Sequence, residues 1–139
     1  MSVITTIAVV PVLTIVLATT LQLGSLRVVA ARASSAADLA TLVAVNDQDD
    51  DELARTGRLV PAVDAEDVAR TIFAANLAPI ASLLAATPTE IASAASVRVE
   101  RAPATVRLQV VVPVRTPLFG ALFFHPISEV AVAANGGAR

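Results

Sequence analysis

Three aspartates at alternate positions are the residues of this chain whose spacing most suggests chemistry. Asp47, Asp49 and Asp51 are arranged like the first ligands of a calcium-binding loop. An EF-hand is excluded, because the position that requires glycine is Glu52 and the position that requires glutamate is Arg58. The pattern predicts a solvated acidic loop, with a looser surface calcium site as the alternative. We predict no bound metal and no other cofactor.

The single histidine, His125, is the other candidate for chemistry. A catalytic triad or a zinc site would need partners at positions that the sequence does not mark. The sequence contains no cysteine, and its five glycines form no phosphate-binding loop. We therefore predict that the protein is not an enzyme, and that His125, directly before Pro126, is a loop residue.

The composition argues for an apolar, structural protein. Of the 139 residues, 55% are hydrophobic, and the excess is concentrated in residues 1–26. The net charge is −2 and the aromatic residues are four phenylalanines, so neither a basic face nor stacking side chains favour a nucleic-acid partner.

The N-terminal segment between Val3 and Leu26 carries no charged residue, and the first charge is Arg27. As a helix it would span roughly 36 Å, enough for a hydrocarbon core near 30 Å. Its Val, Ile and Leu residues contribute about −4 to −8 kcal/mol to insertion. Thr5, Thr6, Thr14 and the other threonines subtract from this, as does Gln22, although threonine hydroxyls can bond back to helix carbonyls. The residues predicted to lie in a membrane or a filament core are Val3, Ile4, Ile7, Val10, Pro11, Leu13, Ile15, Leu17, Leu21, Leu23 and Leu26.

Three interpretations of this segment compete. A cleaved signal peptide is disfavoured, because the apolar run is long and no basic residue precedes it. A plain membrane anchor and a pilin-type helix, held first in the membrane and later in a filament core, both fit. Arg27 and Arg32 follow the segment, which by itself would place the C-terminal part in the cytoplasm. Removal of a short basic leader before Met1 would resolve this conflict.

The helix is predicted to continue to about residue 45, because no proline or glycine follows Gly24 and alanine is the best helix former. Pro11 and the Gly24 region would let it bend. The expected domains are therefore an N-terminal helix over 1–45 and a globular part over 46–139. Small residues at 30, 33, 36, 37, 40 and 44 predict a face that copies of the chain approach closely. Val29, Leu39, Leu42 and Val43 are expected to contact the globular part.

The globular part is predicted to be α+β, with a second helix and a small three-stranded antiparallel sheet. The helix covers Val63 to Ala86 and is capped by Asp64. Alternation from Ile91 onwards predicts strands over 96–101 and 105–112, and a third follows over 129–133. The apolar stretch 118–126 either plugs the core as a short helix or contacts a neighbouring subunit.

The stretch Ser34-Ser35-Ala36-Ala37-Asp38-Leu39-Ala40-Thr41-Leu42-Val43-Ala44 resembles the region after the transmembrane helix of TadE/TadG-like proteins. These are pilin-like components of tight-adherence (Flp/Tad) pili, within the type IV pilus superfamily. The ending from Val110 to Ala134 is similar as well. Type IV pilins usually carry glutamate at the fifth mature position, where this chain has Thr5 if Met1 is the mature start.

The resemblance implies a structural subunit that polymerises through its N-terminal helix into an extracellular pilus. Its partners would be copies of itself, the membrane before assembly, and the assembly machinery; its location would be the inner membrane, then the pilus. The alternative is a single-span accessory protein of pilus assembly. A soluble or periplasmic binding module would need residues 1–26 to be removed. The residues expected to make contacts between subunits are Arg27, Arg32, Asp38, Phe119, Phe123 and Phe124, with Asp38 pairing with Arg32 or with Arg27 of another copy.

Overall fold

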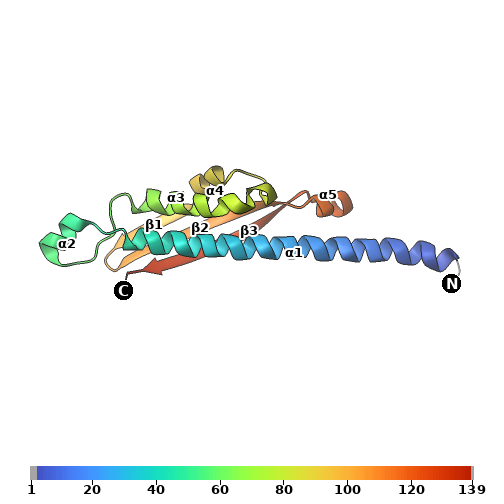
Figure 1. The fold of residues 1–139 in the computed structure, drawn as a ribbon, viewed down its shortest axis with the longest axis horizontal. Helices are drawn as coiled ribbons and strands as arrows, with labels where there is room; N and C mark the ends of the chain where they lie inside the picture. The colour runs from blue at the N-terminus through green and yellow to red at the C-terminus, as the bar shows by residue number, and fades with distance from the viewer. Residues whose placement is uncertain (1–2, 139) are drawn as a thin grey trace.

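The longest element of the fold is the helix α1 (Val3–Asn46). The computed structural model describes residues 3–138, apart from the side chain of Thr5. Figure 1 shows α1 as one nearly straight rod, without the bends expected at Pro11 and Gly24. The prediction of a single helix to about residue 45 is confirmed. The predictions about Met1 and about the Thr5 side chain lie outside the described residues.

Shorter helices and three strands follow α1, and the predicted α+β class is confirmed. The strands form one antiparallel sheet in the order β1-β2-β3, and α5 connects β2 to β3. The elements are α2 (Asp50–Thr56), α3 (Ala65–Leu77), the 3-10 helix η1 (Ala78–Leu83), α4 (Pro88–Ala94), β1 (Ser96–Arg101), β2 (Ala104–Arg115), α5 (Pro117–Phe123) and β3 (Ile127–Gly137).

The core lies between one face of the sheet and the two helices α1 and α3 (Figure 1). β2 alternates buried and exposed residues along its length, as expected for a strand with one face in water. Most of its inward side chains pack in one cluster with Phe73 and Leu77 of α3 and with Val29 of α1, while Val106 packs in a second cluster with Ala44, Val45 and Ala69. The inward residues of β2 are Val106, Leu108, Val110, Val112 and Val114.

The small-residue face of α1 is buried inside the chain's own fold. Ala33, Ala37 and Ala40 are fully buried. Gly136 of β3 lies so close to α1 that an added Cβ would be 2.7 Å from the carbonyl oxygen of Thr41. The expectation that this face meets other copies is therefore wrong, because α3 and the sheet occupy it.

The larger residues of the same half of α1 are distributed differently from the prediction. Val29 is buried, but Leu39 and Leu42, which were expected to contact the globular part, are 43% and 52% exposed. The alanines face inward because only small side chains let the helix approach the sheet this closely. The C-terminal half of α1 is thus part of the core, and the division into 1–45 and 46–139 does not follow the packing.

Several predicted boundaries also differ in the structure. The acidic stretch after Asn46 contains the short helix α2, and its left-handed C-cap is Gly57 with φ 68°. The predicted helix over 63–86 ends at Leu77 and continues as the 3-10 helix η1, which contains Pro79. Asp64 precedes α3 without a side-chain cap.

Residues 88–94, where strand alternation was expected to begin, form α4. Its N-terminus carries a capping box: Thr87 accepts from the Glu90 N–H, and the Glu90 carboxylate accepts from the Thr87 N–H at 2.9 Å. Hydrogen bonding to Thr87, first of all to its backbone N–H, holds the pKa of Glu90 below its ordinary value. The motif satisfies backbone groups at the helix start, and this explains why a helix forms here.

Arg70 of α3 holds the C-terminal end of α4. Its Nη1 donates to the carbonyl oxygens of Ala92, Ser93 and Ala95 at 2.8, 3.0 and 2.7 Å, and its Nη2 bonds Glu66 at 2.7 Å. A cation at these carbonyls satisfies groups that the helix leaves without partners. Arg70 therefore joins α3 to α4 just before the chain enters the sheet.

Candidate functional site: an uncovered apolar helix end

The N-terminal half of α1 projects beyond the rest of the fold (Figure 1). Val3 is 74% exposed and Leu13 is 68% exposed, and the most apolar window of this helix is only 6% buried. We call residues 3–21 the bare segment. The large apolar side chains exposed on it are Val3, Ile4, Ile7, Val9, Val10, Val12, Leu13, Ile15, Val16, Leu17 and Leu21.

Exposure on this scale requires a partner or an apolar medium. Each such side chain gains roughly 1.5–3 kcal/mol when fully buried, so eleven of them exceed the stability of a typical domain, about 5–15 kcal/mol. Within the part of the chain that the structure describes, α1 alone is long and apolar enough to cross a membrane. A helix from a soluble core or a signal sequence can pass the same test, but a core helix would be mostly buried.

Three threonine hydroxyls of the bare segment have partners within the helix. The hydroxyls of Thr14, Thr19 and Thr20 donate to carbonyl oxygens four residues earlier, at 2.9, 2.8 and 2.8 Å. Thr14 bonds the Val10 carbonyl and not the Ile7 carbonyl, which lacks its usual donor because Pro11 has no N–H. The predicted back-bonding is confirmed, and it lowers the cost of placing these threonines in an apolar medium.

Gln22 directly follows the bare segment, and from its polarity alone we expect it only to oppose insertion into a membrane. Gln22 is 4% exposed, and its Oε1 accepts a hydrogen bond of 3.1 Å from the Leu118 N–H at the start of α5. From here on, one face of α1 is covered by the folded part. Leu26, predicted to lie in the membrane or filament core, instead packs partly against the chain's own core. A lone amide at the end of an apolar run was the available sequence signal.

Gln22→Leu should loosen α5 from α1. The substitution keeps the volume but leaves the Leu118 N–H without its acceptor, which we expect to cost about 1–2 kcal/mol. Hydrogen exchange of the α5 amides should accelerate about tenfold. Gln109→Leu, at an exposed position on the outer face of the sheet, is the control and should leave α5 unchanged. Unchanged exchange in the Gln22 variant would show that the bond does not hold α5.

α5 presents aromatic side chains beside the bare segment. Phe119 and Phe123 contact each other edge to face, with ring centroids 6.0 Å apart. Phe123 is 52% exposed and Phe124 is 88% exposed, whereas Phe119 is half-buried. The helix predicted within 118–126 is present, but its exposed phenylalanines exclude the interpretation as a core plug. Contact with a neighbour remains the other expectation.

The charged residues expected to make contacts between subunits are all on the surface. Arg27, Arg32 and Asp38 are exposed side chains of α1. The ion pairs among the described residues are Arg55–Glu52 and Arg70–Glu66, so the predicted pair of Asp38 with Arg32 does not form within one chain. Pairing with Arg27 of another copy stays a prediction.

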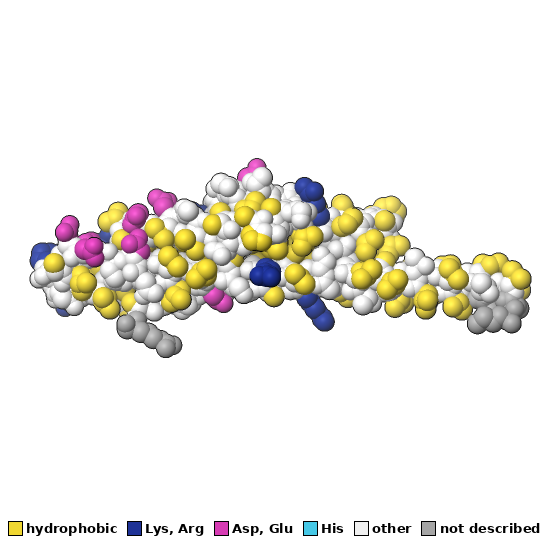
Figure 2. Space-filling model, viewed as in Figure 1, with side chains coloured by type: hydrophobic (Ala, Val, Ile, Leu, Met, Phe, Trp, Pro, Cys, Tyr) yellow, Lys and Arg dark blue, Asp and Glu magenta, His cyan; other side chains and the backbone are white. Residues whose placement is uncertain are grey.

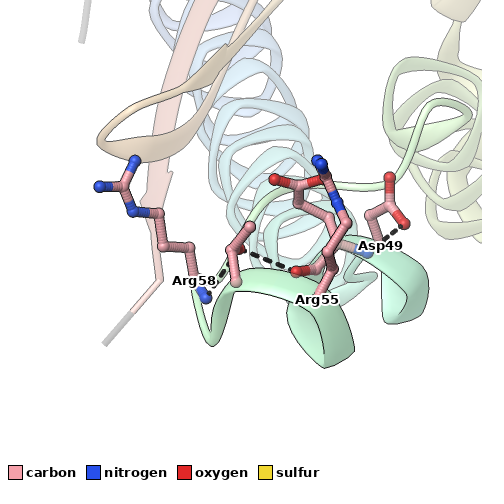
Figure 3. Close-up of polar contacts among 5 residues, drawn as sticks. Asp49, Arg55 and Arg58 are labelled. Carbon is pink, nitrogen blue, oxygen red and sulfur yellow. Dashed lines mark hydrogen bonds and ion pairs between the residues drawn. The ribbon is translucent and has the colours of Figure 1, made fainter.

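The acidic region around α2 is organised by local hydrogen bonds (Figure 3). Asp49 caps α2 through the Glu52 N–H at 3.1 Å, and Arg55 bonds the Glu52 carboxylate at 2.5 Å. Arg58 donates its backbone N–H to Thr56 at 3.3 Å. Loss of water contact raises the pKa of Asp47 above its ordinary value, and the nearby carboxylates of Asp64 and Asp50 raise this pKa further. Among the residues described, no group of three or more acidic or histidine side chains could hold a metal ion.

His125 lies in the turn after α5. Its Nδ1 is 3.3 Å from the carbonyl oxygen of Phe124, and its own carbonyl accepts from the buried Thr116 hydroxyl at 2.7 Å. These contacts hold the turn in place, as expected for a loop residue. The geometry that stands out is therefore a surface, formed by the bare segment and α5, rather than a cluster of reactive side chains.

Figure 2 shows apolar side chains over the projecting end of the molecule and acidic side chains gathered towards the opposite end. Comparison with protein families, with curated proteins and with solved structures gives no match for this chain. What the structure establishes is the class of architecture: an α+β unit packed on the C-terminal half of one long helix, with the N-terminal half of that helix long and apolar enough to cross a membrane.

Proposed function

We propose that the chain is a structural, pilin-like subunit that polymerises through its bare segment into an extracellular filament of the type IV or Tad type. The observation that carries the proposal is the division of α1: one face of its C-terminal half is buried in the core, whereas its N-terminal half is exposed and apolar. The hydroxyls of Thr14, Thr19 and Thr20 in or next to that exposed half are bonded within the helix. The resemblance of residues 34–44 and 110–134 to TadE/TadG-like proteins supports the same function.

The bare segment suits both places that such a subunit must occupy. At about 1.5 Å per residue it spans roughly 28 Å, which matches the hydrocarbon core of a bilayer. Because it carries no charge, moving it from lipid to a bundle of identical helices exchanges one apolar environment for another. The inner membrane would thus hold the subunit before assembly, and the filament core would hold it afterwards.

The buried alanine face limits how copies can pack. Ala33, Ala37 and Ala40 are covered by the chain's own sheet and α3, so this face is not open to the α1 helices of other copies, and the bare segment would make the main apolar contacts between them. The folded parts would then coat the outside of the filament. Their acidic ends, around α2, would lie at the end of each subunit away from its bare segment (Figure 1).

Shearing of cells that produce the protein tests this function. A filament subunit should be released into the detergent-free supernatant as a sedimentable polymer, while a cytoplasmic marker stays in the cells. N-terminal sequencing of the released protein would show whether Met1 is the mature start. Retention of the whole population in the membrane fraction would contradict the filament and would favour a single-span accessory protein of pilus assembly.

A further inference from the structure

Phe124 has an unfavourable backbone conformation that its contacts within the chain do not offset. It adopts the left-handed backbone conformation, with φ 58° and ψ 28°, at the C-cap of α5. That position favours glycine or asparagine, and a bulky residue costs about 1–2 kcal/mol there. The side chain is also 88% exposed, so it gains little from packing within the chain. An aromatic ring kept outside at such cost points to a partner outside the chain.

The turn that carries Phe124 is anchored rather than loose. Thr116 is fully buried; its N–H donates to the Pro126 carbonyl at 2.8 Å and its hydroxyl to the His125 carbonyl at 2.7 Å. Gln22 fixes the other side of α5 to α1. Phe123 and Phe124 are therefore presented at a defined level along α1.

That level coincides with the end of the bare segment. If the roughly 28 Å of residues 3–21 fill the hydrocarbon core, then Gln22 and the start of α5 lie at the boundary between acyl chains and headgroups. Apolar side chains at this depth insert about 5–10 Å into a bilayer surface. Phe123, Phe124 and the 55% exposed Ile127 at the start of β3 are large apolar side chains exposed at or next to α5, and we call these three residues the α5 patch.

The charges near this level fit an anionic lipid surface. Arg27 lies about 8 Å further along α1 than Gln22, and Arg115 ends β2 just before α5; both are exposed. Arg115 also lines one surface hollow with Leu21 and Gln22. Glu129 is the acidic residue of β3 near this end, whereas the acidic residues between 47 and 67 lie towards the other end of the fold.

We infer that α5 rests on the bilayer surface around the base of α1, with Phe123 and Phe124 inserted among the lipids and Arg27 and Arg115 at the level of anionic headgroups. This inference rests on the proposed function in one respect, since α1 must first span the bilayer. The partner that we propose is an anionic phospholipid bilayer, and the experiment below distinguishes it from a second copy of the chain.

Single-tryptophan variants of the full-length protein test the inference, because the native chain has no tryptophan and no tyrosine. Phe124→Trp reports on α5 and Leu13→Trp on the middle of the bare segment. Val63→Trp, at an 84% exposed position before α3, is the control in water. Each variant is reconstituted into vesicles of phosphatidylcholine with and without phosphatidylglycerol, and lipids brominated near the headgroup or deep in the acyl chain serve as quenchers.

The expected result is blue-shifted emission from Phe124→Trp that shallow bromines quench, deep quenching of Leu13→Trp, and water-like emission from Val63→Trp. Adding Arg27→Gln and Arg115→Gln to Phe124→Trp should abolish any increase in quenching caused by phosphatidylglycerol. Water-like emission from Phe124→Trp with deep quenching of Leu13→Trp overturns the inference and leaves the membrane helix standing. Blue-shifted but unquenched emission from Phe124→Trp assigns the α5 patch to a second copy. Unquenched Leu13→Trp removes both the inference and the membrane stage of the proposed function.

Discussion

Leu13→Arg should remove most of the protein from membranes and from filaments. Leu13 is 68% exposed near the middle of the bare segment, so replacing its side chain should not lower the stability of the folded part. An arginine near the centre of a spanning helix costs about 2.5–3.5 kcal/mol and also loses the favourable leucine term. Partitioning into the bilayer should therefore fall by about two to three orders of magnitude.

Leu39→Arg is the matched control for this prediction. Leu39 lies on the same helix and is 43% exposed, but beside the folded unit, where an arginine side chain can remain in water. Alkaline extraction of membranes should release the Leu13 variant and retain the Leu39 variant, and sheared filaments should be lost with the first. Equal retention of both variants would show that the bare segment does not lie in an apolar medium.

Gly136→Ala should destabilise the folded unit, whereas Gly137→Ala should not. A Cβ at Gly136 would lie 2.7 Å from the Thr41 carbonyl oxygen and 2.8 Å from its carbon, both backbone atoms of a packed helix. A Cβ at Gly137 would meet nothing within 4 Å. Separating β3 from α1 to fit the methyl group should cost about 1–3 kcal/mol.

The adjacent glycine makes the comparison specific. Replacing either glycine with alanine restricts the unfolded chain to a similar degree, so the difference between the variants isolates the contact with α1. Urea unfolding of the full-length variants in detergent micelles measures the difference in their free energies of unfolding. Hydrogen exchange of the β2 and β3 amides shows whether the loss of stability lies in the sheet. If the two variants unfold together, β3 does not approach α1 as closely as the structure shows.

The sequence was sufficient to predict the elements whose signals are local. The long helix follows from an alanine-rich run without proline or glycine after Gly24, and β2 follows from the alternation of apolar and polar residues from Thr105 to Val110. The short helices were harder to predict, because caps decide them. Thr87 and Glu90 form a capping box that starts α4, although the pattern from Ile91 onwards predicts a strand. Asp49 caps α2 in a stretch predicted to be a solvated loop.

The partner of each face of α1 could not be predicted from the sequence. A stripe of alanines allows close approach by any backbone, and the pattern is the same whether that backbone belongs to β3 or to another copy. Only the register that brings Gly136 onto Thr41 decides between them. In the same way, the sequence indicates only that Gln22 opposes membrane insertion. Its role as a hydrogen-bond acceptor depends on Leu118, which is distant in the sequence.

Because α1 is unbroken, one helix carries two separate sets of residues: those that suit the surroundings of its projecting end, and those that pack in the core. Residues before Gln22 contribute nothing to the cluster that holds the sheet, and the inward residues after it, such as Val29 and Ala37, are shielded from whatever surrounds the projecting end. The composition of the first part can therefore vary with the thickness and chemistry of its surroundings while the second part keeps the same shape. A single secondary-structure element thus separates the choice of environment from the maintenance of the fold.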